Sequence, residues 1–203
     1  MTIPCRRGAG GTTLLETVLI LAAIRIVKAR RIFEFGTFLG SNTLNMALNT
    51  PPDAEIFTLD LDAPHAASAD QDASDAVLTH LHLAVGSSLD FVGSPVSKKI
   101  TTLFGDSTSF DFSQWTGTMD FQFIDGGHDL ATVQSDTQNA FKMAAANRES
   151  CIVWHDYRSW DYPALTCYLD ELANENQIFH IEDTKLCIWF NDPFASILPR
   201  LGI

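Results

Sequence analysis

Residues 31–43, RIFEFGTFLGSNT, decide the fold of this chain. The first five residues are a short apolar run that stops at Gly36, which predicts a β-strand followed by a sharp turn. Residues 41–48 then place apolar side chains at helical spacing, and Ser41 or Asn42 is the expected N-cap. A buried strand, a glycine turn and a helix in direct succession are typical of an α/β protein.

The same alternation continues on both sides of this stretch. Further apolar runs predict strands at residues 55–60, 99–104, 119–125, 151–156, 177–181 and 184–190. Apolar spacing predicts further helices at residues 14–27, 72–83, 130–145 and 163–174. This order of elements predicts an α/β fold with a mostly parallel sheet, and the hairpin at the end implies one antiparallel strand at or near an edge.

The apolar run at residues 14–27 follows two arginines and could be mistaken for a leader peptide, of the pilin type with processing after Gly11. Glu16, Arg25 and Lys28 interrupt the stretch, and it holds no span of 18 apolar residues. We therefore expect an amphipathic helix that packs on the domain. Its apolar face would be formed by Leu14, Leu15, Val18, Leu19, Ala22 and Ile26.

Composition excludes several classes of function. The chain has 13 Lys and Arg against 25 Asp and Glu, a formal net charge of −12. Such an acidic chain is poorly suited to bind nucleic acid or an anionic membrane surface, because both need a basic face. The four cysteines, Cys5, Cys151, Cys167 and Cys187, show no CxxC spacing. We interpret them as reduced thiols and expect a cytoplasmic protein.

Acidic residues stand at or beside the ends of five predicted strands: Glu34, Asp60, Asp106, Asp125 and Asp156. Each alone could be a helix N-cap or a turn residue. In an open α/β sheet, however, ligands bind at the carboxyl ends of the strands. We therefore expect these five acids to line one crevice.

The loop after the first strand indicates what this crevice binds. Gly36 and Gly40 do not form the GxGxxG pattern of dinucleotide-binding proteins. Gly36 lets the backbone turn sharply and approach a ligand closely. Asp60 follows 24 residues later, where an acid accepts hydrogen bonds from a ribose diol. A ribose acid beside a loop with few basic residues favours a nucleoside without a pyrophosphate, and S-adenosylmethionine is the expected ligand.

At this point the sequence resembles the class I S-adenosylmethionine-dependent methyltransferases. Residues 34–43 look like the first motif of the catechol and caffeoyl-CoA O-methyltransferases. FIDGGH at 123–128, Asp136 and VWHDY at 153–157 look like a bacterial branch with Asp-Gly-x-His and Trp-His-Asp-Tyr motifs. The resemblance covers about residues 14–190. It implies a Rossmann-like, seven-stranded, mostly parallel sheet with the last strand antiparallel and helices on both faces.

The resemblance also implies a single methyltransferase domain over residues 1–203, with an N-terminal helix region at 1–30 and a variable insert or lid at 63–98. The implied cofactor-binding residues are Glu34, Gly36, Thr37, Phe38, Gly40, Ser41, Asn42, Thr43, Asp60, Leu61, Asp106, Ser107, Asp125 and Gly126. Asp60 would hold the ribose, and Asp106 and Ser107 would lie by the adenine. Glu34 would support the loop or reach the cofactor through water. The chain departs from the branch at Leu130, where an aromatic residue is usual, and at 145–150, which replace Pro-Gly-Gly.

Methyl transfer requires an aligned acceptor that has lost or weakened its proton. By resemblance to the catechol type, Asp125 and Asp156 would bind a divalent cation and His128 would stand in place of the usual lysine base. Imidazole accepts a proton near neutral pH, so we expect His128 to be the general base. The two acids could instead orient His128, and His155 could join them as a metal ligand. Oxygen ligands suit Mg²⁺, whereas a histidine would also admit Mn²⁺ or Zn²⁺.

These residues also allow simpler structural interpretations. His128 could cap a helix, and His155 could be a hydrogen-bonded residue of the core. Trp160 and Tyr157 are candidates for an acceptor pocket, whereas Trp154 is expected to pack in the core.

The sequence therefore predicts an S-adenosylmethionine-dependent O-methyltransferase that acts on a small-molecule acceptor, with a homodimer as the expected assembly. Two alternatives stay open. One is a non-catalytic domain that binds S-adenosylmethionine, and the other is a metal-dependent hydroxylase or hydrolase on the same scaffold.

Overall fold

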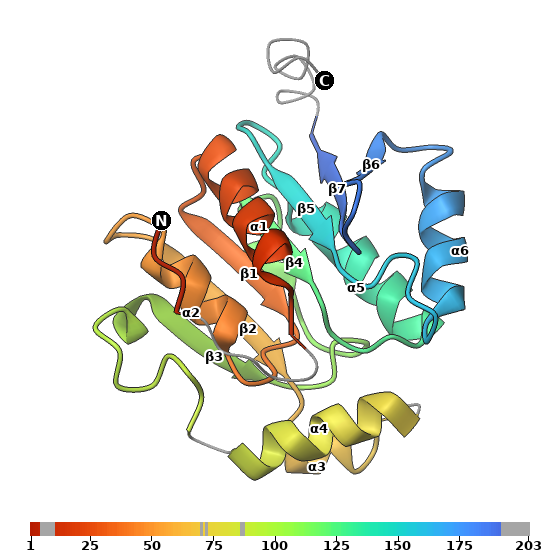
Figure 1. The fold of residues 1–203 in the computed structure, drawn as a ribbon, viewed down its shortest axis with the longest axis horizontal. Coiled ribbons are helices and arrows are strands. Elements are labelled where there is room, and N and C mark those ends of the chain that lie inside the picture. The colour runs from red at the N-terminus through yellow and green to blue at the C-terminus, as the bar shows by residue number, and fades with distance from the viewer. Residues whose placement is uncertain (5–10, 70, 72, 86–87, 192–203) are drawn as a thin grey trace.

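The computed structural model describes residues 1–4, 11–69, 71, 73–85 and 88–191, so Cys5 lies outside the described residues. Its sheet has the strand order β3-β2-β1-β4-β5-β7-β6 (Figure 1). The strands are β1 (Arg31–Phe35), β2 (Glu55–Asp60), β3 (Ile100–Phe104), β4 (Phe121–Ile124), β5 (Cys151–Trp154), β6 (Ile178–His180) and β7 (Cys187–Phe190). Only β7 runs antiparallel to its neighbours, so the predicted seven-stranded α/β fold is confirmed.

Helices cover both faces of this sheet (Figure 1). The helices are α1 (Leu14–Ile26), α2 (Ser41–Leu48), α3 (Ala63–Ala66), α4 (Ala73–Val85), α5 (Leu130–Met143) and α6 (Pro163–Leu172), with 3₁₀ turns η1 (Ser97–Lys99) and η2 (Ser113–Trp115). Under α1 and α2, Ile20 and Ile24 pack with Ile32 and Phe121. The core under α5 and α6 joins Phe33 and Trp154 to Val133 and Leu165. Successive side chains of each strand point to opposite faces of the sheet, so each strand contributes to two separate apolar cores.

The predicted face of α1 is wrong. The residues that are buried are Glu16, Thr17, Ile20, Leu21, Ala23 and Ile24, whereas Leu14, Leu15 and Ile26 are exposed. The helix is apolar around most of its circumference, so spacing alone does not select the side that faces the core. Its rotation brings the acid Glu16 inward, which a search for an apolar stripe does not find.

The predicted N-cap of α2 is also wrong. Gly40 is the N-cap, with φ 80° and no side-chain hydrogen bond, in place of Ser41 or Asn42. A Cβ atom at Gly40 would lie 2.8 Å from the Phe91 ring. Glycine is therefore required here both by the left-handed backbone and by close packing.

The described residues between 63 and 98 form two helices and a 3₁₀ turn, although the composition of this segment predicts mostly irregular structure. The helix expected near residues 72–83 is present as α4, and the sequence did not predict α3 or η1. α3 and α4 lie together beyond the carboxyl end of β2, apart from the helical layers on the two faces (Figure 1). They therefore border the edge where the parallel strands end. Among the described residues, no helix has the length and hydrophobicity needed to cross a membrane.

Candidate active site

The carboxyl ends of β1, β2, β4 and β5 open into a cleft of about 920 Å³. The predicted site residues that line it are Gly36, Phe38, Asp60, Leu61, Asp106, Ser107, Asp125, Gly126, His128, His155 and Asp156. Four of the five acids expected in one crevice are therefore brought together. Glu34 is the exception, because it is completely buried beneath the loop that follows β1.

The glycine loop, residues 36–40, forms one wall of the cleft and is built from close backbone contacts. Gly36 has φ 91°, and a Cβ atom there would lie 2.2 Å from the backbone oxygen of Asp125. Asp60 accepts hydrogen bonds through Oδ2 from the backbone N–H groups of Thr37 at 2.9 Å and Phe38 at 2.7 Å. Asp60 therefore shapes the loop as well as lining the cleft.

Glu34 supports the glycine loop from below. Its Oε2 accepts hydrogen bonds from Thr43 Oγ1 at 2.5 Å and Thr58 Oγ1 at 2.7 Å. Thr58 Oγ1 lies in turn 2.6 Å from Thr37 Oγ1. Burial raises the pKa of Glu34 to about 8, although the two hydroxyl donors oppose this shift. The carboxyl is thus mostly neutral at pH 7, and it acts through the loop instead of the cleft.

Five further predicted cofactor residues do not line the cleft: Thr37 and Gly40 in the glycine loop, and Ser41, Asn42 and Thr43 at the start of α2. Ser41 Oγ donates a hydrogen bond to Asp90 at 2.5 Å. Asn42 Oδ1 accepts one from Thr12 Oγ1 at 2.8 Å. These residues anchor α2 to its surroundings.

The opposite wall holds the acid–histidine cluster, which consists of Asp125, His128, His155 and Asp156. His128 Nε2 lies 3.0 Å from Asp156 Oδ2, and its Nδ1 lies 2.5 Å from Asp75 Oδ1. The backbone N–H of His128 donates to the other oxygen of Asp75 at 2.8 Å. Its ring stacks on Tyr162, with centroids 3.8 Å apart and planes inclined by 7°. The imidazole is thus held at both nitrogens and on one face.

The surroundings of His128 favour its protonated form. Burial opposes the charge, but the hydrogen bonds to Asp156 and Asp75 raise the pKa of His128 to about 10. The helix-capping alternative is wrong, because Asp129 is the N-cap of α5 and accepts from the backbone N–H of Thr132 at 3.0 Å.

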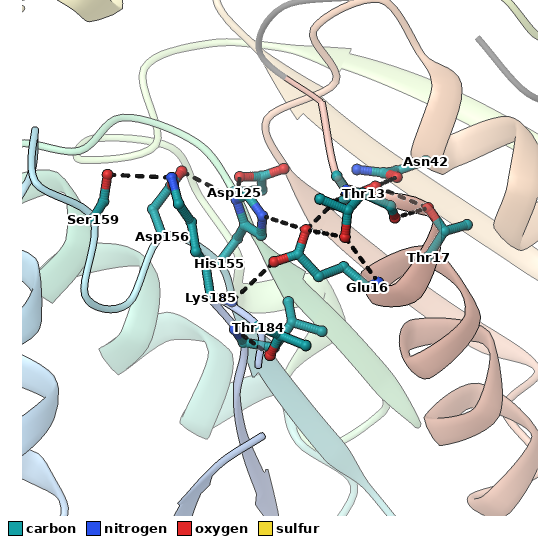
Figure 2. A network of polar contacts seen from close by, with 12 residues as sticks. Thr13, Glu16, Thr17, Asn42, Asp125, His155, Asp156, Ser159, Thr184 and Lys185 are labelled. Atoms are coloured by element: carbon teal, nitrogen blue, oxygen red, sulfur yellow. Dashed lines mark hydrogen bonds and ion pairs between the residues drawn. The ribbon is translucent and has the colours of Figure 1, made fainter. Parts of the chain in front are cut away.

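Asp156 contacts both histidines of the cluster and Lys185, and Figure 2 shows it beside His155 and Lys185. Its Oδ2 lies 3.0 Å from His155 Nδ1, which is also 3.0 Å from Asp125 Oδ1. Its Oδ1 accepts a hydrogen bond from Lys185 Nζ at 3.0 Å. Burial opposes ionisation, but the hydrogen bonds from His128 and His155 hold the pKa of Asp156 well below its usual range. Burial likewise opposes protonation of His155, whose pKa the neighbouring Asp125 raises to about 12.

The backbone at Asp156 is left-handed, with φ 60°. This conformation is uncommon for residues other than glycine, and aspartate tolerates it better than most. Strained backbone of this kind concentrates at functional sites, where the surrounding contacts maintain it.

The cluster can offer a ligand set to a cation. One ligand atom from each of Asp125, His128 and Asp156 lies within 4.8 Å of the others. This set of two carboxylate oxygens and one imidazole nitrogen suits Mg²⁺, Mn²⁺ or Zn²⁺. His155, which we expected as a ligand, is not in this set, and its Nδ1 contacts both carboxylates.

The sequence missed four residues of the site: Glu16, Asp75, Tyr162 and Lys185. Asp75 and Lys185 stand far from their partners in the chain, and no local motif marks them. For Glu16 the pattern Thr-x-x-Glu at 13–16 was available as a capping-box signal.

The aromatic residues expected at the acceptor pocket, Tyr157 and Trp160, do not line the cleft, whereas Tyr162 does. Tyr157 is buried and donates its hydroxyl to Asp170 at 2.6 Å. Trp160 is 99% exposed, whereas Trp154 packs in the core as expected.

Known proteins share this fold. Residues 33–157 match a family model described as a methyltransferase domain. The O-methyltransferase TomG of Streptomyces achromogenes, which is involved in tomaymycin synthesis and was solved with S-adenosylmethionine, has 15% identity and a TM-score of 0.61 over 88% of this chain and 80% of its own. An O-methyltransferase from Bacillus cereus with bound S-adenosylhomocysteine has 15% identity and a TM-score of 0.63 over 90% and 83%.

A third structure, an S-adenosylhomocysteine-bound methyltransferase from Podospora anserina, has 15% identity and a TM-score of 0.63 over 90% of this chain and 80% of its own. No curated protein shows a significant match to the chain. The matching family model covers more than half of the chain. The chain therefore belongs to the methyltransferase-domain family, and its fold is that of the class I S-adenosylmethionine-dependent enzymes.

Proposed function

We propose that this protein methylates a hydroxyl group of a small-molecule acceptor with S-adenosylmethionine as the donor. One observation carries the proposal: the glycine loop and the acid–histidine cluster line a single cleft, in which Gly36 lies directly against the Asp125 backbone. S-adenosylmethionine supplies the methyl group and a sulfonium leaving group. The neighbouring O-methyltransferase structures support the same reaction type.

The residues of the glycine loop wall would bind the cofactor. Gly36 allows the close approach of the methionine part, and Asp60 lines the cleft where a ribose would lie. Asp106 and Ser107 line the cleft beyond β3, where the adenine is expected. Glu34 and Thr43 keep the loop in place from behind.

We assign His128 as the general base. Asp75 holds Nδ1 and so fixes which nitrogen faces the cleft, as a buried aspartate does for histidine in hydrolase triads. Both ring nitrogens donate to carboxylates here, so Nε2 must lose its proton before it can accept one from the acceptor. An acceptor hydroxyl that takes the place of Asp156 Oδ2 at Nε2 would lie within hydrogen-bond reach of the base.

A divalent cation fits the donor set of Asp125, His128 and Asp156. When bound, it would lower the pKa of a coordinated acceptor hydroxyl. If His128 served as a ligand it could not also be the base, so Asp125 and Asp156 are the ligands compatible with this proposal. Lys185 Nζ already supplies a positive charge to Asp156. The expected homodimer stays a prediction.

Titration calorimetry with S-adenosylhomocysteine, followed by transfer of labelled methyl from S-adenosylmethionine to a panel of hydroxylated small molecules, tests the proposal. We expect binding, and transfer that is lost in His128→Ala. Binding with no transfer to any acceptor would favour the non-catalytic alternative. Turnover of a panel compound in the absence of S-adenosylmethionine would favour the hydroxylase or hydrolase alternative.

A further inference from the structure

Glu16 is a charged residue of α1 that is almost completely buried, with 3% of its surface exposed. It closes the capping box of the helix, because Oε2 accepts hydrogen bonds from the backbone N–H of Thr13 at 2.8 Å and from its hydroxyl at 2.9 Å. A capping box explains these two contacts and no others. The burial of the carboxylate and its remaining partners therefore require a second explanation.

The other partners of Glu16 lie at the opposite end of the sequence (Figure 2). Its Oε1 accepts a hydrogen bond from the backbone N–H of Lys185 at 2.9 Å, and Oε2 lies 3.5 Å from His155 Nε2. Lys185 Nζ and His155 Nδ1 each lie 3.0 Å from the carboxylate of Asp156. Glu16 thus contacts both residues that approach Asp156 from this side of the cleft.

The charges agree with the contacts. Burial opposes ionisation of Glu16, but His155 and the donors from Lys185 and Thr13 lower its pKa to about 2. The carboxylate is therefore charged at neutral pH. Three carboxylates surround the His155 ring, with Asp125 and Asp156 at Nδ1 and Glu16 at Nε2. Without the third, the ring would have a polar partner at one edge only.

We propose that Glu16 is a positioning residue of the acid–histidine cluster. It fixes the His155 ring and the Lys185 backbone, and these two residues in turn hold the carboxylates that face the cleft. The importance of this role for catalysis rests on the proposed function, because the cluster is where the acceptor would bind. α1 then contributes to the site through a single side chain.

Nuclear magnetic resonance of protein with ¹⁵N-labelled histidine tests this inference, with the His155 signals assigned by their loss in His155→Gln. In the wild type we expect an Nε2–H resonance of His155 that exchanges slowly with water, because the ring is buried and Glu16 lies 3.5 Å from Nε2. In Glu16→Gln, which keeps the size but removes the charge, we expect this proton to exchange at least about 10-fold faster.

Thr13→Ala is the matched control, because it removes the hydroxyl of the capping box but keeps Glu16 and its contacts to His155 and Lys185. It should weaken the cap of α1 and leave the His155 resonance unchanged. An unchanged resonance in Glu16→Gln would overturn the proposal, and so would an equal loss of protection in Thr13→Ala. Calorimetry with S-adenosylhomocysteine on the wild type separates the two questions, since a failure to bind contradicts the proposed function but not the Glu16 contacts.

Discussion

The two walls of the cleft are built by different means. The glycine loop is held by backbone N–H groups, a left-handed glycine and a buried carboxyl that is mostly neutral at pH 7. The acid–histidine cluster is held by charged side chains that come from α1, α4, the ends of β4 and β5, and the turn before β7. The first wall is therefore local in sequence and depends on shape, whereas the second is dispersed and depends on charge.

Gly36→Ala should have the largest effect on stability and cofactor affinity, because it disrupts the close packing of Gly36 against the Asp125 backbone, where the two walls meet. The new Cβ would lie 2.2 Å from the Asp125 oxygen, and the backbone there has φ 91°. We expect the affinity for S-adenosylhomocysteine, measured by calorimetry, to fall more than about 100-fold. We expect the free energy of unfolding to fall by about 4 kcal/mol.

Gly117→Ala separates backbone strain from the clash. Gly117 also has positive φ, 67°, but no atom lies within 4 Å of an added Cβ. It should cost about 1 kcal/mol and leave cofactor affinity unchanged. If both variants behaved alike, the contact with Asp125 would not be what maintains the glycine loop.

Asp156→Asn changes the acid–histidine cluster and leaves the residues of the glycine loop unchanged. It leaves His128, His155 and Lys185 without their shared carboxylate, and removing one partner of a buried ion pair typically costs about 3–5 kcal/mol. We expect a loss near 3 kcal/mol in urea unfolding, with affinity for S-adenosylhomocysteine within about threefold of the wild type. Asp161→Asn, at an exposed acid that also lines the cleft, should change stability by less than about 0.5 kcal/mol.

Glu34→Gln tests whether the folded protein is more stable with a neutral side chain at position 34, beneath the glycine loop. The pKa of Glu34 is raised to about 8 in the folded protein, so the folded state binds this proton more tightly than the unfolded chain, where the pKa is about 4.3. This contribution to stability is lost as the pH rises from about 4.3 to 8.

Gln is neutral throughout this range. We therefore expect Glu34→Gln to match the wild type near pH 4 and to exceed it by about 2 kcal/mol at pH 6, measured by urea unfolding. Exposed Glu175 provides the control, since Glu175→Gln should give the same difference at both pH values. A constant difference for Glu34→Gln would mean that Glu34 is ionised in the folded protein.

Trp160→Ala should have the smallest effect, because this side chain is 99% exposed and belongs to neither wall. We expect the free energy of unfolding to change by less than about 0.5 kcal/mol. A larger loss of stability would contradict this expectation. A loss of acceptor turnover with cofactor affinity intact would indicate that Trp160 contacts the acceptor.

The sequence predicted the strands and most helices because their signals are local. Apolar runs of four to six residues, each stopped by glycine or an acid, placed β1, β2, β4 and β5. The face of α1 was missed because a helix that is apolar nearly all around carries no directional signal, and its rotation is set by the partners of Glu16.

The same division holds for the site. The glycine loop, Asp60, Asp125 and Asp156 could be found because each follows directly from the end of a strand. Asp75 and Lys185 could not, because their roles depend on where α4 and the turn before β7 lie in space. Asp75 engages Nδ1 of His128 and Asp156 engages Nε2, so the protonation of the predicted base could not be inferred from the DGGH motif alone.

The ion pair between Asp156 and Lys185 also has a consequence for synthesis of the chain. The segments that place Gly36 against Asp125 are complete once residue 125 has been made. The carboxylate of Asp156 acquires its ammonium partner only when Lys185 emerges, about 60 residues later. At about 5–20 residues per second this is a delay of several seconds. A nascent chain can therefore form its cofactor wall while the acids of the other wall still lack one of their cations.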